Sequence, residues 1–401
     1  MLQNPTPTDD IQKLLDDPNS KMEDILNHES CYSLYAENFL PLIQYFTLNH
    51  KELLNLAIFS ENHIIQVRAF SIINLHNQVF LETIIQTHAL SSIIEEQITS
   101  EKPNGLVLDR LFYILEICIE ILFDELKGQL WYLNNSLSLL NHQSVLSFYE
   151  YAFQTDNGEK IVQYLIDIDF FSLLITEIEK ISFPDYDPDL ASGLYELLRL
   201  LLKFKSISSR FESSQSRIYS VITPPTGAPI YVIDQYSFML VDLSTEFSLP
   251  FIVSSLDFLF TKIPPFIHQY QISGFEIAAK LFKIPDISYD LSKIIDFAFD
   301  IFFEQTNHSL ALLGASKLLE EAIKSSAFSK IVINRFLIMA DYVLGSSDNH
   351  ILRPFILNLL RKISDSCPNW ENLDKQLHDK LMQTYVVPYE DTCLNLMDLV
   401  I

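Results

Sequence analysis

The sequence predicts an all-α protein, and three observations support this fold class. The chain has only eight glycines among 401 residues, and no two of them lie closer than 23 positions. Long apolar stretches with helical spacing fill most of its length. The composition is 48% hydrophobic, which is too apolar for a disordered chain despite a formal net charge of −25. Phosphate-binding loops, dinucleotide turns and β-rich domains need clustered glycines, so these classes are largely excluded.

The clearest predicted helix spans residues 106–124, with the sequence LVLDRLFYILEICIEILFD. Its polar residues recur at spacings of four, three, four and four, which places them on one narrow stripe: Asp109, Tyr113, Glu116, Glu120 and Asp124. The rest of this helix is apolar all round. We therefore expect neighbouring helices to sandwich it, as in stacked helical repeats.

Similar amphipathic runs lie before and after this helix, and short polar links separate them. In chain order they span residues 32–46, 51–59, 64–75, 79–86, 161–180, 189–204, 251–262, 287–303, 309–324, 331–344 and 351–363. This succession predicts helical hairpins packed in series.

Capping residues mark several of the predicted helix starts. Six of the ten histidines follow an asparagine, and an asparagine at a helix N-cap accepts a hydrogen bond from an otherwise unpaired N–H. Asp187 precedes Pro188, a residue suited to the first helical position, and so predicts a cap there. A calcium loop over residues 185–196 is the alternative, but Leu190 stands where the sharp turn of such a loop needs glycine.

An internal repeat is indicated by two segments that lie 42 residues apart. NHSLALLGASKLLEE begins at Asn307 and NHILRPFILNLLRKI begins at Asn349, with leucines matching at Leu310/Leu352 and Leu318/Leu360. A period of about 40–47 residues is typical of HEAT and armadillo units. With the phrase QVRAF at residues 66–70, the chain resembles the armadillo/HEAT-type helical repeat superfamily in architecture. That resemblance implies an irregular, right-handed superhelix of stacked helical hairpins that binds partner proteins.

Residues 206–229 break the helical pattern with seven serines within 15 residues, followed by three prolines and a glycine. This composition predicts a surface loop or linker. It divides the chain into an acidic N-terminal helical-repeat half, residues 1–205, and a C-terminal helical-repeat half, residues 230–401. Residues 229–243 are compatible with a short strand pair, but a helix from Tyr236 onward is favoured.

Charge and cysteine content restrict the partners and the compartment. Residues 1–205 hold 30 acidic and 12 basic side chains, so nucleic acid is a poor candidate partner and basic protein segments fit better. The four cysteines are widely spaced, and no secretory signal or transmembrane span is recognised in the sequence. We expect a cytoplasmic or nuclear protein with reduced thiols, no cofactor and no membrane association.

The polar stripe is the candidate partner-binding site. Asp109, Glu116, Glu120 and Asp124 could line a groove that receives lysine or arginine from a partner, because repeated carboxylates raise the local cation concentration. The simpler interpretation is a solvated helix edge.

The serine-rich segment is the candidate regulatory site. Ser213 and Ser220 each lie three residues after an arginine, and Thr223 precedes a proline. Phosphate added at these residues could dock on the neighbouring basic side chains.

The sequence contains no GxSxG, HExxH or Walker motif and no close Cys/His group. It therefore favours a non-enzymatic protein-binding scaffold or regulatory subunit. An adaptor for transport or the cytoskeleton is the first alternative. A helical enzyme with a site assembled from distant residues is the alternative of another class.

Overall fold

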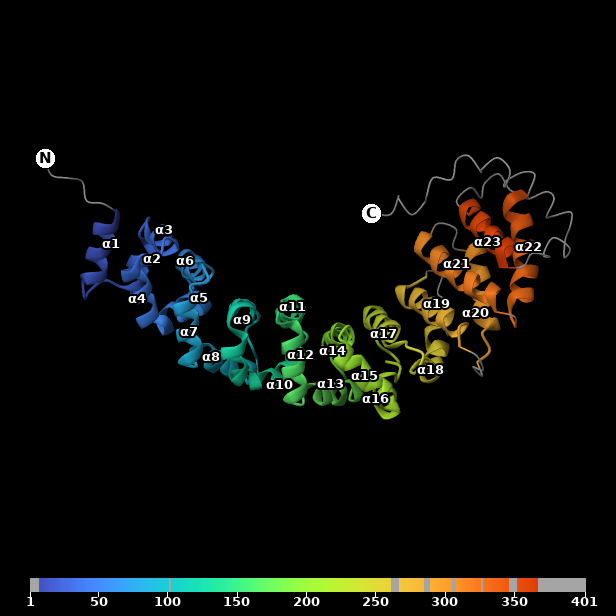
Figure 1. Ribbon diagram of the computed structural model, residues 1–401, viewed down its shortest axis with the longest axis horizontal. Coiled ribbons are helices and arrows are strands. Elements are labelled where there is room, and N and C mark those ends of the chain that lie inside the picture. Colours follow the sequence, from blue (N-terminus) through green and yellow to red (C-terminus); the bar gives the residue numbers. More distant parts are fainter. Residues whose placement is uncertain are drawn as a thin grey trace. The chain divides into compact units, whose positions relative to one another are not determined.

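The computed structural model describes residues 7–100, 102–260, 267–284, 289–304, 308–325, 327–345 and 352–366 (Figure 1). Throughout these ranges the regular structure is helical, with no β-strand. The predicted all-α fold class is confirmed. None of the described helices combines the length and the hydropathy needed to cross a bilayer.

The chain divides into two compact units. Unit 1 comprises Met1–Ile181 and Asp185–Ile207, and unit 2 comprises Ser182–Pro184 and Ser208–Ile401. The division falls within one helix, α15 (Lys205–Glu212).

Unit 1 is built from short α-helices and two 3₁₀ turns. They are α1 (Pro7–Asp16), α2 (Met22–Asn27), α3 (Cys31–Ala36), α4 (Leu40–Leu48), α5 (His50–Phe59), α6 (His63–Ile73), α7 (Gln78–Gln86), α8 (Ala89–Ile98), α9 (Gly105–Leu126), η1 (Lys127–Tyr132), α10 (Leu133–Ser136), η2 (Leu137–Leu139), α11 (Gln143–Gln154), α12 (Gly158–Asp167), α13 (Phe170–Glu179) and α14 (Pro188–Leu202).

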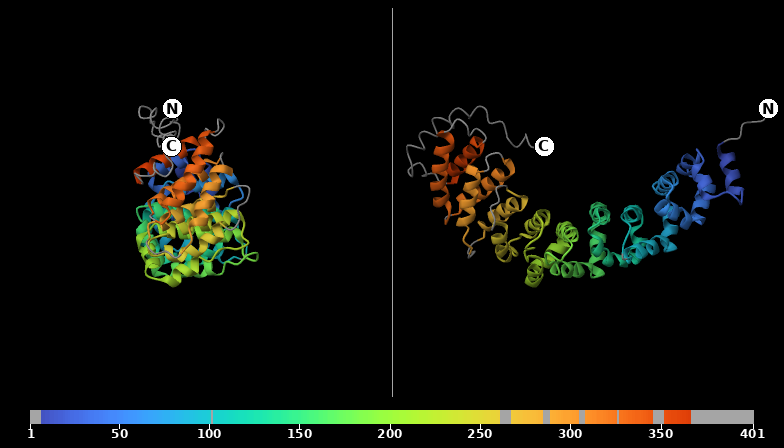
Figure 2. Two further views of the ribbon diagram at one scale, coloured as in Figure 1. Left: turned by 90° about the vertical axis from the view of Figure 1, so that its right-hand side faces the viewer. Right: turned by 180° about the vertical axis from the view of Figure 1, so that it is seen from behind.

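Helices of unit 1 pack on helices that are close to them in the chain. The long helix α9 contacts α5, α7 and α8 before it and α11 after it, and α11 in turn contacts α14. Figure 1 shows α9, α11 and α14 side by side, and the right-hand view of Figure 2 shows the same order from behind. The predicted sandwiching of α9 is confirmed, because Phe112, Leu115 and Cys118 on its apolar faces are fully buried.

Polar side chains join helices that are separated by other elements in the chain, by binding carbonyls near the C-terminal ends of the earlier helices. Such carbonyls lack a partner within their own helix, and positive charge is favourable beside them. Three side chains donate in this way: Arg68 to the oxygen of Leu26, Arg110 to that of Ile58, and Gln129 to that of Ile85. Each bond links segments about 40 to 50 residues apart in the chain.

Most helices of unit 2 have 12 to 17 residues, and α16 has seven. They are α16 (Gln215–Val221), α17 (Ile230–Leu243), α18 (Leu249–Phe260), α19 (Gln269–Leu281), α20 (Ser292–Glu304), α21 (Ser309–Lys324), α22 (Ser329–Gly345) and α23 (Arg353–Ser366). The helix α19 packs on α17, α18, α20 and α21, and α21 packs on α22 and α23. Close packing depends on glycine here, since a Cβ on Gly274 would overlap the ring of Phe260.

The expectation of a loop over residues 206–229 is wrong for most of that segment. α15 and α16 occupy most of it as far as Val221, joined by a short turn at Ser213 and Ser214, and the longer non-helical stretch spans residues 222–229. The reason is that Ile207, Phe211 and Ile218 are buried, so apolar side chains at helical spacing outweigh the serine-rich composition.

Two further details differ from the expectation. The strand pair considered at residues 229–243 is replaced by α17, which begins at Ile230, six residues before Tyr236, because Val232 in its first turn is already buried.

The match between the two repeat segments holds at Leu318 and Leu360, which are both buried. It fails at Leu310, which is 58% exposed, whereas Leu352 is buried. Asn307 and Asn349, which open the two segments, lie outside the described residues.

Candidate partner-binding face of unit 1

The candidate site is a surface to which three helices of unit 1 contribute. It consists of Phe70 and Asn74 at the end of α6, of Tyr113, Glu116 and Glu120 on α9, and of Tyr151 on α11. We call these six residues the tyrosine–glutamate face. Two of the four carboxylates predicted from the stripe on α9 belong to it.

Tyr113 joins α9 to α6. Its hydroxyl donates a hydrogen bond of 3.0 Å to Oδ1 of Asn74, and its ring lies 5.2 Å from the ring of Phe70, measured between centroids. The Tyr113 side chain nevertheless remains 40% exposed. Tyr113 therefore holds the two helices together while part of the residue faces solvent.

Tyr151 joins α9 to α11 in a similar manner. Its hydroxyl donates a hydrogen bond of 2.6 Å to Oε2 of Glu120. The bond to this carboxylate, together with partial burial, raises the pKa of Tyr151 to about 12, because ionisation would lose the bond and place two negative charges together. Tyr151 is 37% exposed and Glu120 is exposed.

Glu116 lies on α9 between Tyr113 and Glu120, and it is half-buried. Burial raises the pKa of Glu116 to about 7. No hydrogen bond or ion pair joins its carboxyl group to another residue of the described ranges. The face thus holds a partly desolvated carboxylate that lacks a cationic partner, beside exposed aromatic surface.

A kink in α9 separates Asp124 from the rest of the stripe. Leu122 has non-helical backbone angles, φ −132° and ψ 38°. Just before it, Nδ2 of Asn157 donates to the carbonyl oxygens of Ile119 and Glu120, at 3.2 and 3.3 Å. A side chain that binds the backbone carbonyls of a helix in this way is a recognised cause of a kink.

Beyond the kink, Asp124 is bound by two lysines. Its carboxylate oxygens lie 3.0 Å from Nζ of Lys127 and 3.1 Å from Nζ of Lys160. The hydrogen bonds from Lys127 and then Lys160 lower the pKa of Asp124. At the opposite end of the stripe, Asp109 is exposed. Asp124 is therefore already neutralised, and Asp109 is a solvated carboxylate.

Sequence reasoning missed Asn74, Tyr151 and Asn157, which come from neighbouring helices. Periodicity identifies the polar side of each helix but not the helix that lies beside it. A tyrosine on the polar side of α11 was the available signal for Tyr151.

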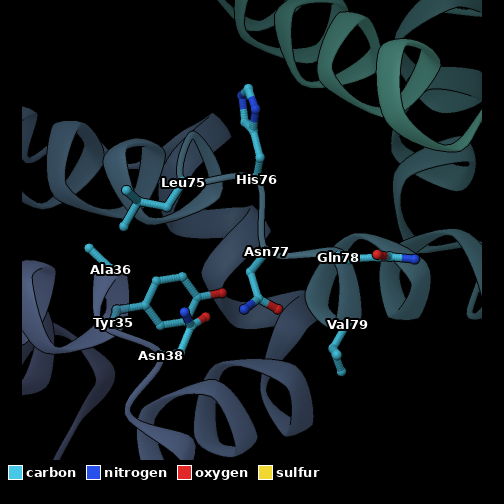
Figure 3. Close-up of a pocket in the computed structure, with 8 residues that line it drawn as sticks. All are labelled: Tyr35, Ala36, Asn38, Leu75, His76, Asn77, Gln78 and Val79. Carbon is cyan, nitrogen blue, oxygen red and sulfur yellow. The ribbon is translucent and has the colours of Figure 1, made fainter.

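A second feature is a cavity of about 320 Å³ between the end of α3 and the link from α6 to α7 (Figure 3). It is lined by Tyr35, Ala36, Asn38, Leu75, His76, Asn77, Gln78 and Val79. Figure 3 shows the Tyr35 hydroxyl directed toward the side chain of Asn77, with His76 pointing away from the tyrosine ring. The lining has one imidazole and one phenol, and it has no carboxylate or thiol.

The three predicted phosphorylation sites lie in different settings within unit 2. Ser213 is exposed in the turn between α15 and α16, and Thr223 is exposed after α16. Ser220 is half-buried inside α16, where its hydroxyl donates to the carbonyl of Ser216.

Other candidates from the sequence are structural. Asp187 caps α14 as predicted, since its carboxylate accepts a hydrogen bond from the N–H of Asp189. Cys31 and Cys118 are buried, and burial raises the pKa of each thiol to about 12. Cys367 and Cys393 lie outside the described residues. Over the ranges that the structure describes, no three metal-binding side chains gather.

No protein-family model matches the chain, and no curated protein matches it. Among solved structures, the crystal structure of an engineered protein from the Northeast Structural Genomics Consortium is similar, with a TM-score of 0.49 and 11% sequence identity. The alignment covers 88% of this chain and 87% of that chain. This likeness assigns no function.

Proposed function

We propose that the protein is a non-enzymatic scaffold or regulatory subunit that binds a basic segment of a partner protein on the tyrosine–glutamate face. Its architecture would be an irregular, right-handed superhelix of the armadillo/HEAT type. Two observations support this architecture: helices pack on their neighbours in the chain, and side chains such as Arg68 and Arg110 bind helix ends about 40 to 50 residues earlier.

The observation that carries the proposal is the environment of Glu116. A half-buried carboxylate without a cationic partner is unfavourable in the free protein, as its raised pKa reflects. A lysine or arginine from a partner would supply the missing charge in a partly desolvated setting, where charge-assisted hydrogen bonds are strong.

The tyrosines define the rest of the recognition chemistry. Tyr113 precedes Glu116 by one turn on α9, Tyr151 binds Glu120 one turn after it, and both tyrosines are partly exposed. Aromatic rings attract cations and pack on the aliphatic part of lysine and arginine. Tyrosine is also enriched among the residues that dominate binding energy at interfaces. The excess of acidic over basic residues in positions 1–205 would speed the approach of a basic partner.

The test is a matched pair of double charge reversals in the full-length protein. Glu116→Lys/Glu120→Lys alters the face, whereas Glu95→Lys/Glu96→Lys changes the same charge on exposed residues of α8. Binding to a fluorescent arginine-rich peptide and recovery of partners from the native cell are measured at low and high salt. We expect the first variant to weaken binding by about tenfold or more and the second by less than about threefold.

Each outcome of this experiment is decisive. Equal losses in both variants would show that net charge alone attracts basic peptides. Unchanged binding in the Glu116/Glu120 variant, with its helical content intact by circular dichroism, would remove the face as the binding site. Partners that are insensitive to salt and to both reversals would count against recognition of basic segments.

A further inference from the structure

The turn between α15 and α16 brings Ser213 and Arg217 to one backbone atom. The Ser213 hydroxyl donates a hydrogen bond of 3.1 Å to the carbonyl oxygen of Arg210. Nη1 of Arg217 donates to the same oxygen at 3.3 Å. Two groups that share one acceptor are close enough for a phosphate on the serine to reach the guanidinium.

The structure distinguishes this serine from its sequence equivalent. Ser213 and Ser220 each follow an arginine by three residues, so sequence alone gives them equal standing. Ser213 is exposed in a turn, where a kinase can bind the chain in an extended form. Ser220 is half-buried in α16, and its hydroxyl is bonded to the helix backbone.

We propose that Ser213 is a phosphorylation site and that Arg217 binds the added phosphate, thereby clamping α15 to α16. This inference does not depend on the proposed partner-binding face, which lies in unit 1. In the reaction, a protein kinase transfers the γ-phosphoryl group of ATP to Oγ of Ser213. The new Oγ–P bond forms, the bond from the γ-phosphorus to the β–γ bridging oxygen breaks, ADP leaves, and the hydroxyl proton passes to the catalytic base of the kinase.

The modification changes the bonding at the turn. Phosphorylated Oγ no longer donates to the Arg210 carbonyl, and Arg217 exchanges a bond to a neutral carbonyl for charge-assisted bonds to phosphate, which are about twice as strong. Glu212 is exposed beside the site and adds a like charge, which solvent screens. The expected net effect is that opening of the α15–α16 turn becomes rarer.

The test uses the full-length protein, ATP and a serine kinase that selects arginine three residues before its target. Mass spectrometry locates the phosphate, and hydrogen exchange is followed over residues 208–221. We expect phosphate on Ser213 well ahead of Ser220, and amide exchange in this segment about five- to tenfold slower after phosphorylation.

Variants assign the effect to Arg217. Arg217→Gln keeps Arg210, the arginine that precedes Ser213 by three residues, while it removes the corresponding arginine of Ser220. It should still be phosphorylated on Ser213 and should lose the slowing of exchange, whereas Arg217→Lys should keep part of it. Should Arg217→Gln unfold α16, the lysine variant carries this comparison. Ser213→Ala is the control for labelling.

Three results would overturn the inference. One is equal phosphorylation of Ser213 and Ser220 in the folded protein. Another is absence of phosphate on Ser213 when a peptide of residues 206–221 is readily modified. The third is slowed exchange that persists unchanged in Arg217→Gln, which would show that Arg217 does not hold the phosphate.

Discussion

The hydroxyl of Tyr151 on α11 donates a 2.6 Å hydrogen bond to Oε2 of Glu120 on α9. These residues are 31 positions apart in the chain, and their bond crosses the boundary between two packed helices. It fixes one oxygen of the carboxylate and leaves the remaining acceptor positions of Glu120 for other donors. The bond therefore links the packing of unit 1 to the charge it presents to partners.

Removal of this hydroxyl should have a small, measurable effect on stability. Tyr151→Phe keeps the ring and loses a hydrogen bond to a charged but exposed acceptor, so we expect the free energy of unfolding to fall by less than about 1 kcal/mol. Urea denaturation measures this change in the free energy of unfolding. The control is Tyr32→Phe, because Tyr32 is 52% exposed and makes no such bond within the described chain. Equal effects in the two variants would contradict a role for the bond.

Glu116 should make the protein less stable as the pH rises. Its pKa is about 7 in the folded chain and near its ordinary value of 4.5 in the unfolded chain. Between these values the folded state binds the proton more tightly, so this group's contribution to stability is lost as pH rises from about 4.5 to 7. Above pH 7 the folded protein holds a poorly solvated charge.

The variant Glu116→Gln removes that charge while it keeps the size of the side chain. At pH 8 we expect its free energy of unfolding to exceed that of the wild type by about 1–2 kcal/mol, a range that allows for solvent screening. At pH 5 the two proteins should be nearly equal. Thermal or urea unfolding at both pH values checks this. The difference in unfolding free energy between wild type and variant isolates Glu116, because the histidines contribute equally to both proteins. A difference that does not change with pH would refute the assignment.

Asn157 should stabilise the kinked form of α9. Asn157→Ala leaves the carbonyls of Ile119 and Glu120 without their donor, and we expect a loss of about 1–3 kcal/mol in urea denaturation. The control is Gln163→Ala, since within the residues that the structure describes Gln163 bonds only to the exposed Asp167, one turn away. The control should change stability by less than about 0.5 kcal/mol. A similar loss in both would show that the bonds from Asn157 contribute no more to stability than an exposed side-chain bond does.

Gly193 should resist a substitution that usually stabilises helices. Replacement of glycine by alanine inside a helix ordinarily gains about 1 kcal/mol. In α14, however, the new methyl group would overlap the carbonyl oxygen of Leu140, so Gly193→Ala should destabilise the protein by about 2 kcal/mol or more. Gly128→Ala is the matched control, because a methyl there meets nothing within 4 Å. In thermal unfolding, the melting temperature should fall for Gly193→Ala. It should rise or stay unchanged for Gly128→Ala.

Local features of the fold could be predicted because they depend on nearby residues. The spacing of polar residues predicted a helix over 106–124, and α9 spans Gly105–Leu126. Asp187 before Pro188 predicted the cap of α14. Composition was a weaker guide, since the serines of residues 206–229 indicated a loop where buried Ile207 and Phe211 form part of a helix.

The candidate site likewise combines residues that the sequence predicted with residues that only the fold brought together. The carboxylates Glu116 and Glu120 were predicted from their shared stripe, whereas Tyr151 and the kink at Leu122 were not. The stripe itself gave no sign that Asp124 pairs with lysines, one of which, Lys160, lies 36 residues away on α12.

By itself, the sequence determined that the chain is helical, which sides of its helices are apolar, and where an acidic stripe lies. Those properties follow from side chains within one or two helical turns of each other. Only the tertiary structure decided that Tyr151 binds Glu120, that Glu116 is partly desolvated, and that Ser213 and Arg217 meet at one carbonyl. Periodicity shows that an apolar face must be covered, but the covering helix, and the polar contacts along its edge, depend on how side chains distant in the chain pack together.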